Sequence, residues 1–493
     1  MDCDTLIRNA TLYDGSGAEP EVADIAISAD RITAIGVSLK VEAANIIEAE
    51  FLALAPGFID THTHDDTAVI SNPAMLPKLS QGVTTVITGN CGISAAPVAL
   101  KAQPPDPMNL LGDAAAFRYP TFASYVAAIN TAQPSVNVVA LVGHTALRSN
   151  HMPHLDRPAT SDEIAAMRAQ LIEALDHGAI GLSTGLAYLS ANAATTDEVV
   201  ALANLLTDPL VAAGAIYTTH LRSESEAILD AMHEAFTIGR ESRAPVIVSH
   251  LKCAGIANWG RSIEVLAALE SAQKNQPVAC DCYPYAASSS TLDLRQVDPR
   301  VKIIITWSTT HPEVGGKLLS KIAEEWGVSQ LDAAKRLQPA GAIYHSISEQ
   351  DMRRILAHPA TMIGSDGLPL DPHPHPRLWG TFPRVLGRYS RDEKLFPLSE
   401  AVHKMTGLPA QRFNLAQRGL IREGFYADLV LFDPATIIDT ATFEDPQQPS
   451  KGIRAVWVNG SLSYTAKGAT QHRAGRFLPR SPIHSSTNGG HAA

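Results

Sequence analysis

Apolar runs of strand length recur along the middle of this chain and alternate with stretches of helical periodicity. Helices are predicted at 161–176, 196–213 and 225–240, and the first has an N-capping residue at its start. Such alternation is typical of parallel βαβ units. Eight units predict an α/β fold, a (β/α)₈ or TIM barrel, with a doubly wound sheet as the alternative. The eight strand-like runs centre on Phe58, Val86, Val139, Gly181, Ile216, Val248, Cys280 and Ile363.

The two ends of the chain share a different pattern, in which short alternating strands are separated by turn residues. We therefore predict one small β domain built from residues 1–55 and 415–478, beside a barrel at 56–414. The long interval at about 288–348 predicts an insertion over the strand ends, where a lid would contribute to the substrate pocket. The final segment, 479–493, is rich in Ser, Pro, Gly and His, a composition that predicts disorder.

The overall composition is that of a globular protein, with 493 residues of which 45% are hydrophobic and 18% are charged. The formal net charge of -11 argues against nucleic acid or an anionic membrane as a partner. The apolar runs are much shorter than the ~20 residues of a membrane helix, and the acidic N-terminus lacks the features of a signal peptide. We therefore expect a cytoplasmic protein that acts on a small molecule.

Residues that commonly bind metal ions follow several of the predicted strands. His62 and His64 are two residues apart in an extended segment, so both imidazoles can face one point. Cys91, His220 and His250 each end another strand-like run, and the strand ends of a barrel converge on one site. These three would form a Cys-His₂ zinc site that leaves one position for water. His62 and His64 would complete this set, replace part of it or hold a second ion.

Two further strand ends carry candidates for proton transfer. Asp366 ends the last predicted strand, where it is placed to accept a proton from a metal-activated water and to pass it to a leaving group. His144 ends the third strand and is the next candidate for this role.

Cationic and hydroxyl side chains near the same strand ends indicate an anionic substrate. Lys252 lies two residues beyond His250, and Arg377 follows Asp366 through a loop of prolines and histidines. Tyr283 ends the seventh strand and is followed by a run of three serines. Together these groups can bind a carboxylate through charge-assisted hydrogen bonds, whereas ordinary surface salt bridges are the competing interpretation.

Three long motifs resemble those of the D-aminoacylase family in the amidohydrolase superfamily. They are Ala55-Pro56-Gly57-Phe58-Ile59-Asp60-Thr61-His62-Thr63-His64-Asp65-Asp66, the segment 80–92 that ends in Gly89-Asn90-Cys91-Gly92, and the segment 364–382 that begins Gly364-Ser365-Asp366-Gly367. The similarity spans about residues 5–465. It implies zinc-dependent hydrolysis of N-acyl-D-amino acids.

The resemblance also implies roles for individual residues. It places a tight zinc at Cys91, His220 and His250, with His62, His64 and Asp366 around a weaker second position. Asp366 is then general base and acid. Lys252, Tyr283, Ser289 and Arg377 are then the groups that hold the substrate α-carboxylate, and Cys91 replaces the bridging lysine of other amidohydrolases, which residues 179–185 lack.

Two alternatives to this function remain open from the sequence. A hydantoinase-like hydrolase of cyclic amides normally needs the missing lysine, which counts against it. A non-catalytic scaffold on the same fold usually lacks metal ligands, and none is missing here.

The side chain of the substrate is a separate question. Tyr344 and Ile347 in the insertion would line an apolar pocket for residues such as D-Met or D-Leu. Alternatively, Arg295 would pair with the side chain of an N-acyl-D-glutamate or N-acyl-D-aspartate, unless Asp293 already neutralises it. We favour neutral, hydrophobic substrates.

Overall fold

The computed structural model describes residues 2–211 and 214–481. Of the tail predicted to be disordered, 482–493 lie outside the described residues, as do residues 212–213 of the helix predicted at 196–213. The described start of the tail is packed against the protein, since the Arg480 amide donates to the Gly178 carbonyl at 3.0 Å.

Parallel strands form at all eight predicted positions and pair in two sheets. One sheet has the order β10-β7-β6, and the other has the order β11-β12-β13-β14-β15-β19. Only Leu141 separates β10 from β11, and the Thr61 amide and hydroxyl both donate to the Ile363 carbonyl, so β6 and β19 are also adjacent. The strands are β6 (Phe58–Asp60), β7 (Val83–Thr88), β10 (Asn137–Ala140), β11 (Val142–Gly143), β12 (Gly181–Gly185), β13 (Ile216–His220), β14 (Val246–Val248), β15 (Val278–Cys282) and β19 (Thr361–Ile363).

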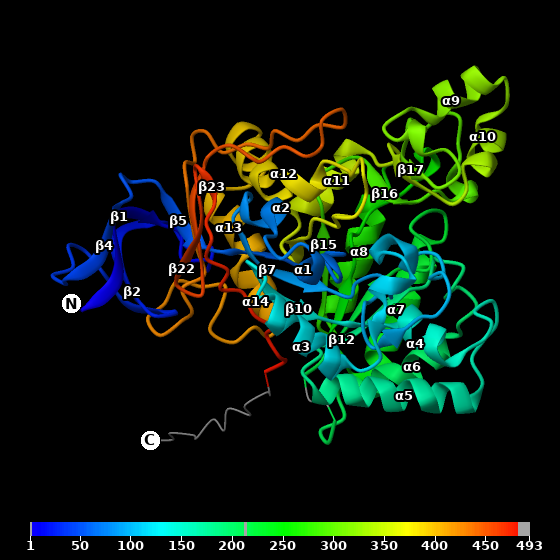
Figure 1. Cartoon of the computed structure of the whole chain (residues 1–493), viewed down its shortest axis with the longest axis horizontal. Helices are drawn as coiled ribbons and strands as arrows, with labels where there is room; N and C mark the ends of the chain where they lie inside the picture. The colour runs from blue at the N-terminus through cyan, green and yellow to red at the C-terminus, as the bar shows by residue number, and fades with distance from the viewer. Residues whose placement is uncertain (1, 212–213, 482–493) are drawn as a thin grey trace.

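Helices connect these strands and cover them on the outside (Figure 1). The helix predicted at 161–176 forms with those bounds, because Thr160 and Glu163 make a reciprocal capping box at its start. The helix predicted at 196–213 ends at Ala203, ahead of Pro209. The helix predicted at 225–240 forms instead at Ile228–Ser242. The helices between the strands include α3 (Phe122–Ala132), α4 (His144–His151), α5 (Ser161–Asp176), α6 (Thr196–Ala203), α7 (Ile228–Ser242), α8 (Ser262–Gln273), α11 (Glu349–Ala357), α12 (Arg377–Arg384) and α13 (Leu398–Met405), with the short α1 (Ala68–Ser71), α2 (Leu76–Leu79) and α14 (Gly407–Arg412).

A nine-stranded sheet combines strands from both ends of the chain. Its order is β23-β22-β21-β20-β5-β1-β2-β3, with β4 paired to β1, and Figure 1 shows the blue and red strands side by side. Trp457 on β21 is among its fully buried side chains. The strands are β1 (Cys3–Leu12), β2 (Glu21–Ser28), β3 (Arg31–Gly36), β4 (Ala43–Glu48), β5 (Ala53–Pro56), β20 (Leu429–Phe432), β21 (Ile453–Val458), β22 (Ser461–Thr465) and β23 (Gly468–Ala469).

The predicted insertion is a small layered unit with its own hydrophobic core. Strands β16 (Ser288–Thr291), β18 (Ala340–Tyr344) and β17 (Ile303–Ser308) form an antiparallel sheet, and α9 (Leu319–Trp326) and α10 (Gln330–Leu337) pack on it. It projects at the upper right of Figure 1. The sequence analysis predicted an insertion here but not its sheet, because antiparallel partners lie far apart in the chain.

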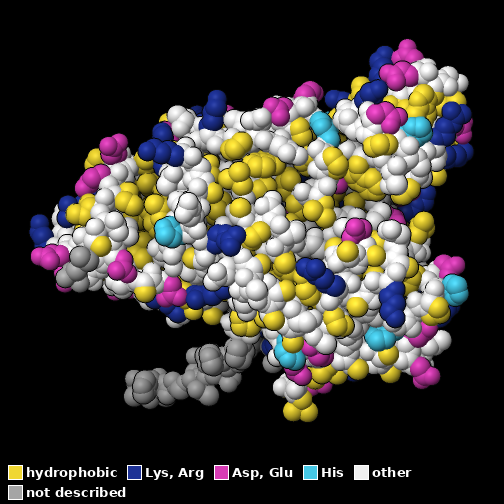
Figure 2. All heavy atoms as spheres, in the orientation of Figure 1, with side chains coloured by type: hydrophobic (Ala, Val, Ile, Leu, Met, Phe, Trp, Pro, Cys, Tyr) yellow, Lys and Arg dark blue, Asp and Glu magenta, His cyan; other side chains and the backbone are white. Residues whose placement is uncertain are grey.

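The surface in Figure 2 shows Lys and Arg side chains interspersed with Asp and Glu. Among the described residues, no helix combines the length and apolar character that crossing a membrane requires.

Candidate metal centre

A cavity of about 890 Å³ lies at the carboxyl ends of the parallel strands and beneath the insertion. His64, His220, His250 and Asp366 line it from the strand ends. The segment predicted as an insertion contributes Ser289, Arg295 and Tyr344 to the same cavity.

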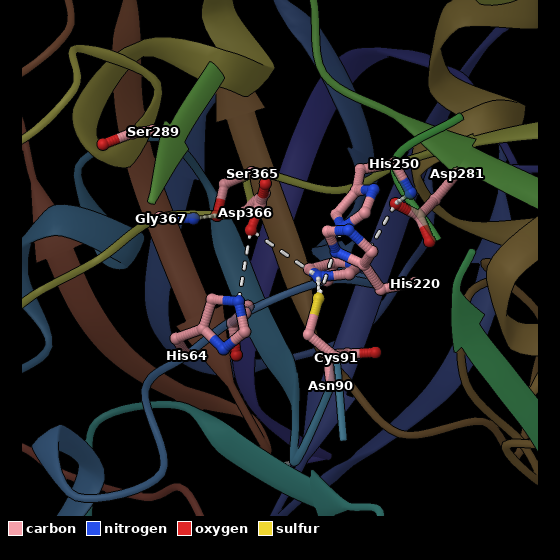
Figure 3. A network of polar contacts seen from close by, with 12 residues as sticks. His64, Asn90, Cys91, His220, His250, Asp281, Ser289, Ser365, Asp366 and Gly367 are labelled. Atoms are coloured by element: carbon pink, nitrogen blue, oxygen red, sulfur yellow. Dashed lines mark hydrogen bonds and ion pairs between the residues drawn. The ribbon is translucent and has the colours of Figure 1, made fainter. Parts of the chain in front are cut away.

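Three of the lining or adjacent residues have backbone angles that most side chains avoid. Cys91 has a φ of 55°, His250 of 37° and Asp366 of 49°. Left-handed conformations at residues other than glycine are uncommon and concentrate at functional sites, where the surrounding structure enforces them. Each residue stands in the turn directly after its strand, and the turn aims the side chain at the common point seen in Figure 3.

Potential metal ligands converge in three overlapping groups within the described part of the chain. In each group, the ligand atoms all lie within 4.8 Å of one another. The Cys91 Sγ atom lies 3.2 Å from Nε2 of His62 and 3.2 Å from Nε2 of His250. The groups are His62-Cys91-His250, His62-His64-Asp366 and His220-Glu224-His250.

This donor set fits zinc. Bonds of about 2.0 Å to nitrogen and about 2.3 Å to sulfur in a tetrahedron separate neighbouring ligand atoms by roughly 3.5 Å. The Cys91–His62 and Cys91–His250 separations are close to this value. Thiolate and imidazole ligands are those that zinc selects. The predicted residues are therefore all at one centre, although His220 is grouped with Glu224 rather than directly with Cys91.

The electrostatics of the centre favour an ionised thiol. Burial by itself raises the pKa of Cys91, but the charges of His62 and His250 outweigh burial and bring this pKa well below the ordinary thiol value. The pairing of opposite charges also acts on the imidazoles. Burial lowers the pKa of His64, whereas the hydrogen bond to Asp366 opposes this effect, and the pKa is raised to about 9. Several positive charges thus stabilise a cluster of anions in the space where the ligand atoms meet.

Asp366 is tied to both the metal cluster and the predicted anion-binding groups. Its Oδ1 lies 3.2 Å from His64 Nε2 and its Oδ2 lies 2.8 Å from Arg377 Nη1. Burial alone raises the pKa of Asp366, but Arg377 and the hydrogen bond from His64 hold this pKa well below its usual value. The carboxylate is therefore ionised and oriented.

Two acidic residues at the centre were missed by the sequence analysis. Glu224 Oε1 lies 3.0 Å from His250 Nδ1 and 2.5 Å from Lys252 Nζ. Asp281 Oδ1 accepts the His250 amide at 2.8 Å and lies 3.3 Å from His62 Nδ1. A signal for Asp281 was present, because it alternates with Cys280 and Cys282 on β15 and so faces the opposite side from these core residues.

The groups predicted to bind a carboxylate also lie together. Arg377 Nη2 donates to the Ser289 carbonyl at 3.0 Å, and the Arg377 guanidinium carbon lies 4.5 Å from the ring centre of Tyr283. Among the described residues, the buried Tyr283 hydroxyl and the Ser289 Oγ have no hydrogen-bond partner. Both cations are already paired, Lys252 with Glu224 and Arg377 with Asp366. The sequence analysis considered salt bridges of these cations at the surface, whereas both pairs are largely buried.

His144 is a correction to the sequence analysis. It begins α4, its Nε2 lies 3.0 Å from Glu198 Oε1, and it is not among the described residues that line the cavity. The third strand ends early, at Gly143, and turns directly into the helix, so this imidazole packs against α6 and cannot act as the alternative base.

The residues predicted to contact the substrate side chain have different positions. Tyr344 lines the cavity, and its hydroxyl donates to the Thr291 carbonyl at 3.0 Å. Ile347 is buried but is not among the described residues that line the cavity. Arg295 also lines the cavity, and its Nε and Nη2 both donate to Asp293, as the sequence analysis considered.

Comparison with known proteins gives a consistent result. The model of the amidohydrolase family matches residues 45–250 and 327–464. The chain is 50% identical to D-aminoacylase of Alcaligenes xylosoxydans xylosoxydans over 97% of this chain and 98% of that protein. A solved structure of D-aminoacylase, from work on its binuclear metal centre, has a TM-score of 0.94 at 48% identity and covers 97% of this chain and 100% of its own.

A second solved structure adds a bound ligand. N-acyl-D-glutamate deacylase from Bordetella bronchiseptica, complexed with zinc and a phosphonate mimic of the tetrahedral intermediate, has a TM-score of 0.93 at 41% identity. It covers 98% of this chain and 100% of that chain. The chain belongs to the amidohydrolase family, in the group that contains D-aminoacylase.

Proposed function

We propose that this protein is a zinc-dependent hydrolase of N-acyl-D-amino acids that releases a carboxylate and a free D-amino acid. The observation that carries this proposal is the convergence of Cys91, His250 and Asp366, each in a strained turn, in a chain that is 50% identical to D-aminoacylase. In this assignment Cys91, His220 and His250 hold the tight zinc. His62, His64 and Asp366, with Cys91, surround a second and weaker position.

Asp366 is the proposed general base and acid. Bound zinc would polarise the acyl carbonyl and lower the pKa of the attacking water. The ionised carboxylate of Asp366 takes one proton from this water and delivers it to the amide nitrogen as the C–N bond breaks. Arg377 holds Asp366 ionised before the reaction, as the lowered pKa indicates.

Lys252, Tyr283, Ser289 and Arg377 are the proposed contacts of the substrate α-carboxylate. The unpartnered hydroxyls of Tyr283 and Ser289 support this assignment, because a buried polar group without a hydrogen bond is costly and is usually satisfied by a ligand or water. Fixing the carboxylate and the acyl group leaves one direction for the Cα substituent, which accounts for the choice of the D-enantiomer.

We further propose a neutral side chain on the preferred substrate. The bidentate pair with Asp293 compensates the charge of Arg295, and Asp106 lies in the same cavity. N-acyl-D-glutamate or N-acyl-D-aspartate is the second candidate, because Arg295 keeps more than half of its side chain exposed and lines the cavity.

A substrate panel tests the function. N-acetyl-D-Met, N-acetyl-D-Leu, N-acetyl-D-Glu and N-acetyl-D-Asp would be compared with their L-enantiomers by the release of free amino acid. We expect turnover of D-substrates, fastest with D-Met or D-Leu, and nearly none of the L-forms. Comparable turnover of both enantiomers would contradict the function, and faster turnover of the acidic D-substrates would select the second candidate.

The fold supports a finer proposal about architecture. We propose that the eight parallel strands close into one (β/α)₈ barrel, because Thr63 and Gly367 form a parallel bridge that joins the segments after the first and last strands. The proposed domains are a barrel at 56–414 and a β domain at 1–55 and 415–478.

A further inference from the structure

Behind the metal centre, a fully buried lysine connects the two segments that carry the second-position ligands. Lys78 on α2 has no exposed surface, and neither have Asp60 and Ser365. Its Nζ lies 2.8 Å from Asp60 Oδ2, 3.1 Å from Asp65 Oδ2 and 3.0 Å from Ser365 Oγ. The ammonium donates hydrogen bonds to Asp60 and Ser365 and forms an ion pair with Asp65.

The partners of Lys78 flank the proposed ligands on both sides. Asp60 and Asp65 enclose the segment of His62 and His64. On the other segment, Ser365 precedes Asp366 directly, and its Oγ accepts the amide of Gly367 at 3.2 Å. Lys78 therefore contacts a residue directly next to His64 and a residue directly next to Asp366.

Asp60 makes the connection between the segments direct. Its Oδ2 pairs with Lys78, while its Oδ1 accepts the Ser365 amide at 2.7 Å and lies within 3.4 Å of the His62 amide. The Asp366 amide in turn donates to the His62 carbonyl at 2.8 Å. Figure 3 shows Ser365, Asp366 and Gly367 beside His64. Lys78 itself is not among the described residues that line the cavity, so it acts through other residues.

We propose that Lys78 is a positioning residue that sets the spacing between the His62–His64 pair and Asp366. It thereby controls the affinity of the second metal position and the rate of proton transfer. Removing the ammonium leaves the two buried carboxylates of Asp60 and Asp65 without a counter-charge. Their repulsion would displace the His62–His64 segment relative to Asp366. Loss of such supporting contacts typically lowers metal affinity or activity about 10- to 100-fold.

The fold provides a matched control lysine. Lys404 on α13 is 1% exposed, and its Nζ donates to the His358 carbonyl at 2.6 Å, near the opposite end of β19. Lys404→Met therefore removes a buried ammonium that contacts the start of β19 without touching the residues beside Asp366. Lys78→Met and Lys404→Met should both lower the stability of the fold.

The test measures zinc binding as well as catalysis. Metal-stripped wild type, Lys78→Met and Lys404→Met would be titrated with ZnCl₂, and the reloaded proteins would be assayed on N-acetyl-D-Met below their unfolding temperatures. For Lys78→Met we expect the tight site to be retained, the second site to weaken at least about tenfold, and kcat to fall at least about tenfold with KM changed less than about twofold. Lys404→Met should match wild type in all three.

Equal behaviour of the two variants would overturn the proposal. If Lys78→Met does not fold, Ser365→Ala keeps both ion pairs and the backbone link to Asp60, and removes only the hydroxyl that contacts Lys78 and the Gly367 amide. This variant should lower kcat severalfold at constant KM, and unchanged kcat would overturn the proposal. Lys78→Met combined with Asp65→Asn keeps the charge of the cluster and removes the repulsion between the carboxylates, so part of the lost kcat should return. A double variant that is no more active than Lys78→Met would overturn the proposal. The kinetic measurements rest on the proposed function, and an inactive wild type would refute that function while the zinc titration still decides the role of Lys78.

Discussion

Cys91, His250 and Asp366 each occupy a left-handed conformation that costs folding free energy, of order 1–3 kcal/mol per residue. Their side chains nevertheless stay close to their shared contact residues. The turns have room for this because a Cβ atom at Gly89, Gly92 or Gly367 would collide with neighbouring atoms. The chemistry of the centre therefore depends on backbone geometry as much as on residue type. Substitutions that keep the shape of these side chains separate the two effects.

The role of Asp366 is tested by Asp366→Asn, which keeps the size of the side chain and removes the base. We expect kcat to fall about 10²- to 10⁴-fold, because general base catalysis contributes that much. The tight zinc should remain, since its ligands are elsewhere. Steady-state kinetics and zinc content by elemental analysis would check both. Unchanged kcat would exclude Asp366 as the base.

The role of Cys91 is tested by Cys91→Ala. The Cys91 Sγ atom contacts both His62 and His250, so the variant should lose the tight zinc and its activity together. Cys280→Ala is the control, since Cys280 is an equally buried thiol packed in the core. Retention of zinc in Cys91→Ala would place the tight site elsewhere.

At the scale of elements, the loop after β19 links the metal centre to the insertion. Asp371 in this loop is buried, and Thr306 and Trp307 of β17 contact its carboxyl group. Burial raises the pKa of Asp371 to about 7, because its effect exceeds the opposing effects of these hydrogen bonds and of the Arg377 charge. The junction between the parallel strands and the insertion therefore contains a carboxyl group that is readily protonated.

This raised pKa predicts a pH-dependent stability. Between about pH 4 and pH 7 the folded state keeps a proton that the unfolded state has released, so stability falls as the pH rises through this range. Asp371→Asn should remove the effect, which is at most about 4 kcal/mol because each pKa unit is worth about 1.4 kcal/mol. Thermal unfolding should show the variant more stable than wild type at pH 8 and similar to it at pH 4. A difference that does not change with pH would contradict this account.

At the scale of the whole molecule, a buried polar network joins the terminal sheet to the parallel strands. Asp428 forms an ion pair with Arg418 and accepts the Asn459 amide at 2.7 Å. It also accepts the Asn137 side-chain amide at 3.2 Å, and Asn137 begins β10. Residues from three distant parts of the chain thus depend on one carboxylate.

Asp428→Ala should destabilise the protein by about 3–5 kcal/mol, because it leaves a buried guanidinium unpaired. Urea unfolding of the zinc-saturated protein would measure the loss. Lys321→Ala is the control, since it removes a pair with Glu324 that is largely exposed and should cost less than about 1 kcal/mol. Equal effects of the two substitutions would show that this network does not hold the two parts together.

Much of the local structure was predictable because its causes are local. The eight strand positions follow from periodicity, and the bounds of α5 follow from its capping residues. Placement at strand ends explains the convergence of His62, His64, Cys91, His220, His250 and Asp366. The exceptions at this level also have local causes: α6 ends ahead of Pro209, and the third strand turns into α4 at Gly143, which takes His144 out of the site.

Tertiary structure alone decided which charges meet. Glu224, Asp281 and the Lys78 cluster have no short motif that would indicate them in the sequence. Lys252 lies 28 residues from Glu224 in the chain, and Lys78 lies 287 residues from Ser365.

 The antiparallel sheet of the insertion likewise pairs β16 with β18 across some fifty residues. Periodicity reports which face of an element is buried, whereas the partner of a buried charge depends on how distant elements pack. The sequence by itself therefore determined the strands, the candidate ligand types and the reaction class. The tertiary structure decided that Lys252 and Arg377 are already paired and that Lys78 contacts Asp60, Asp65 and Ser365 behind the centre.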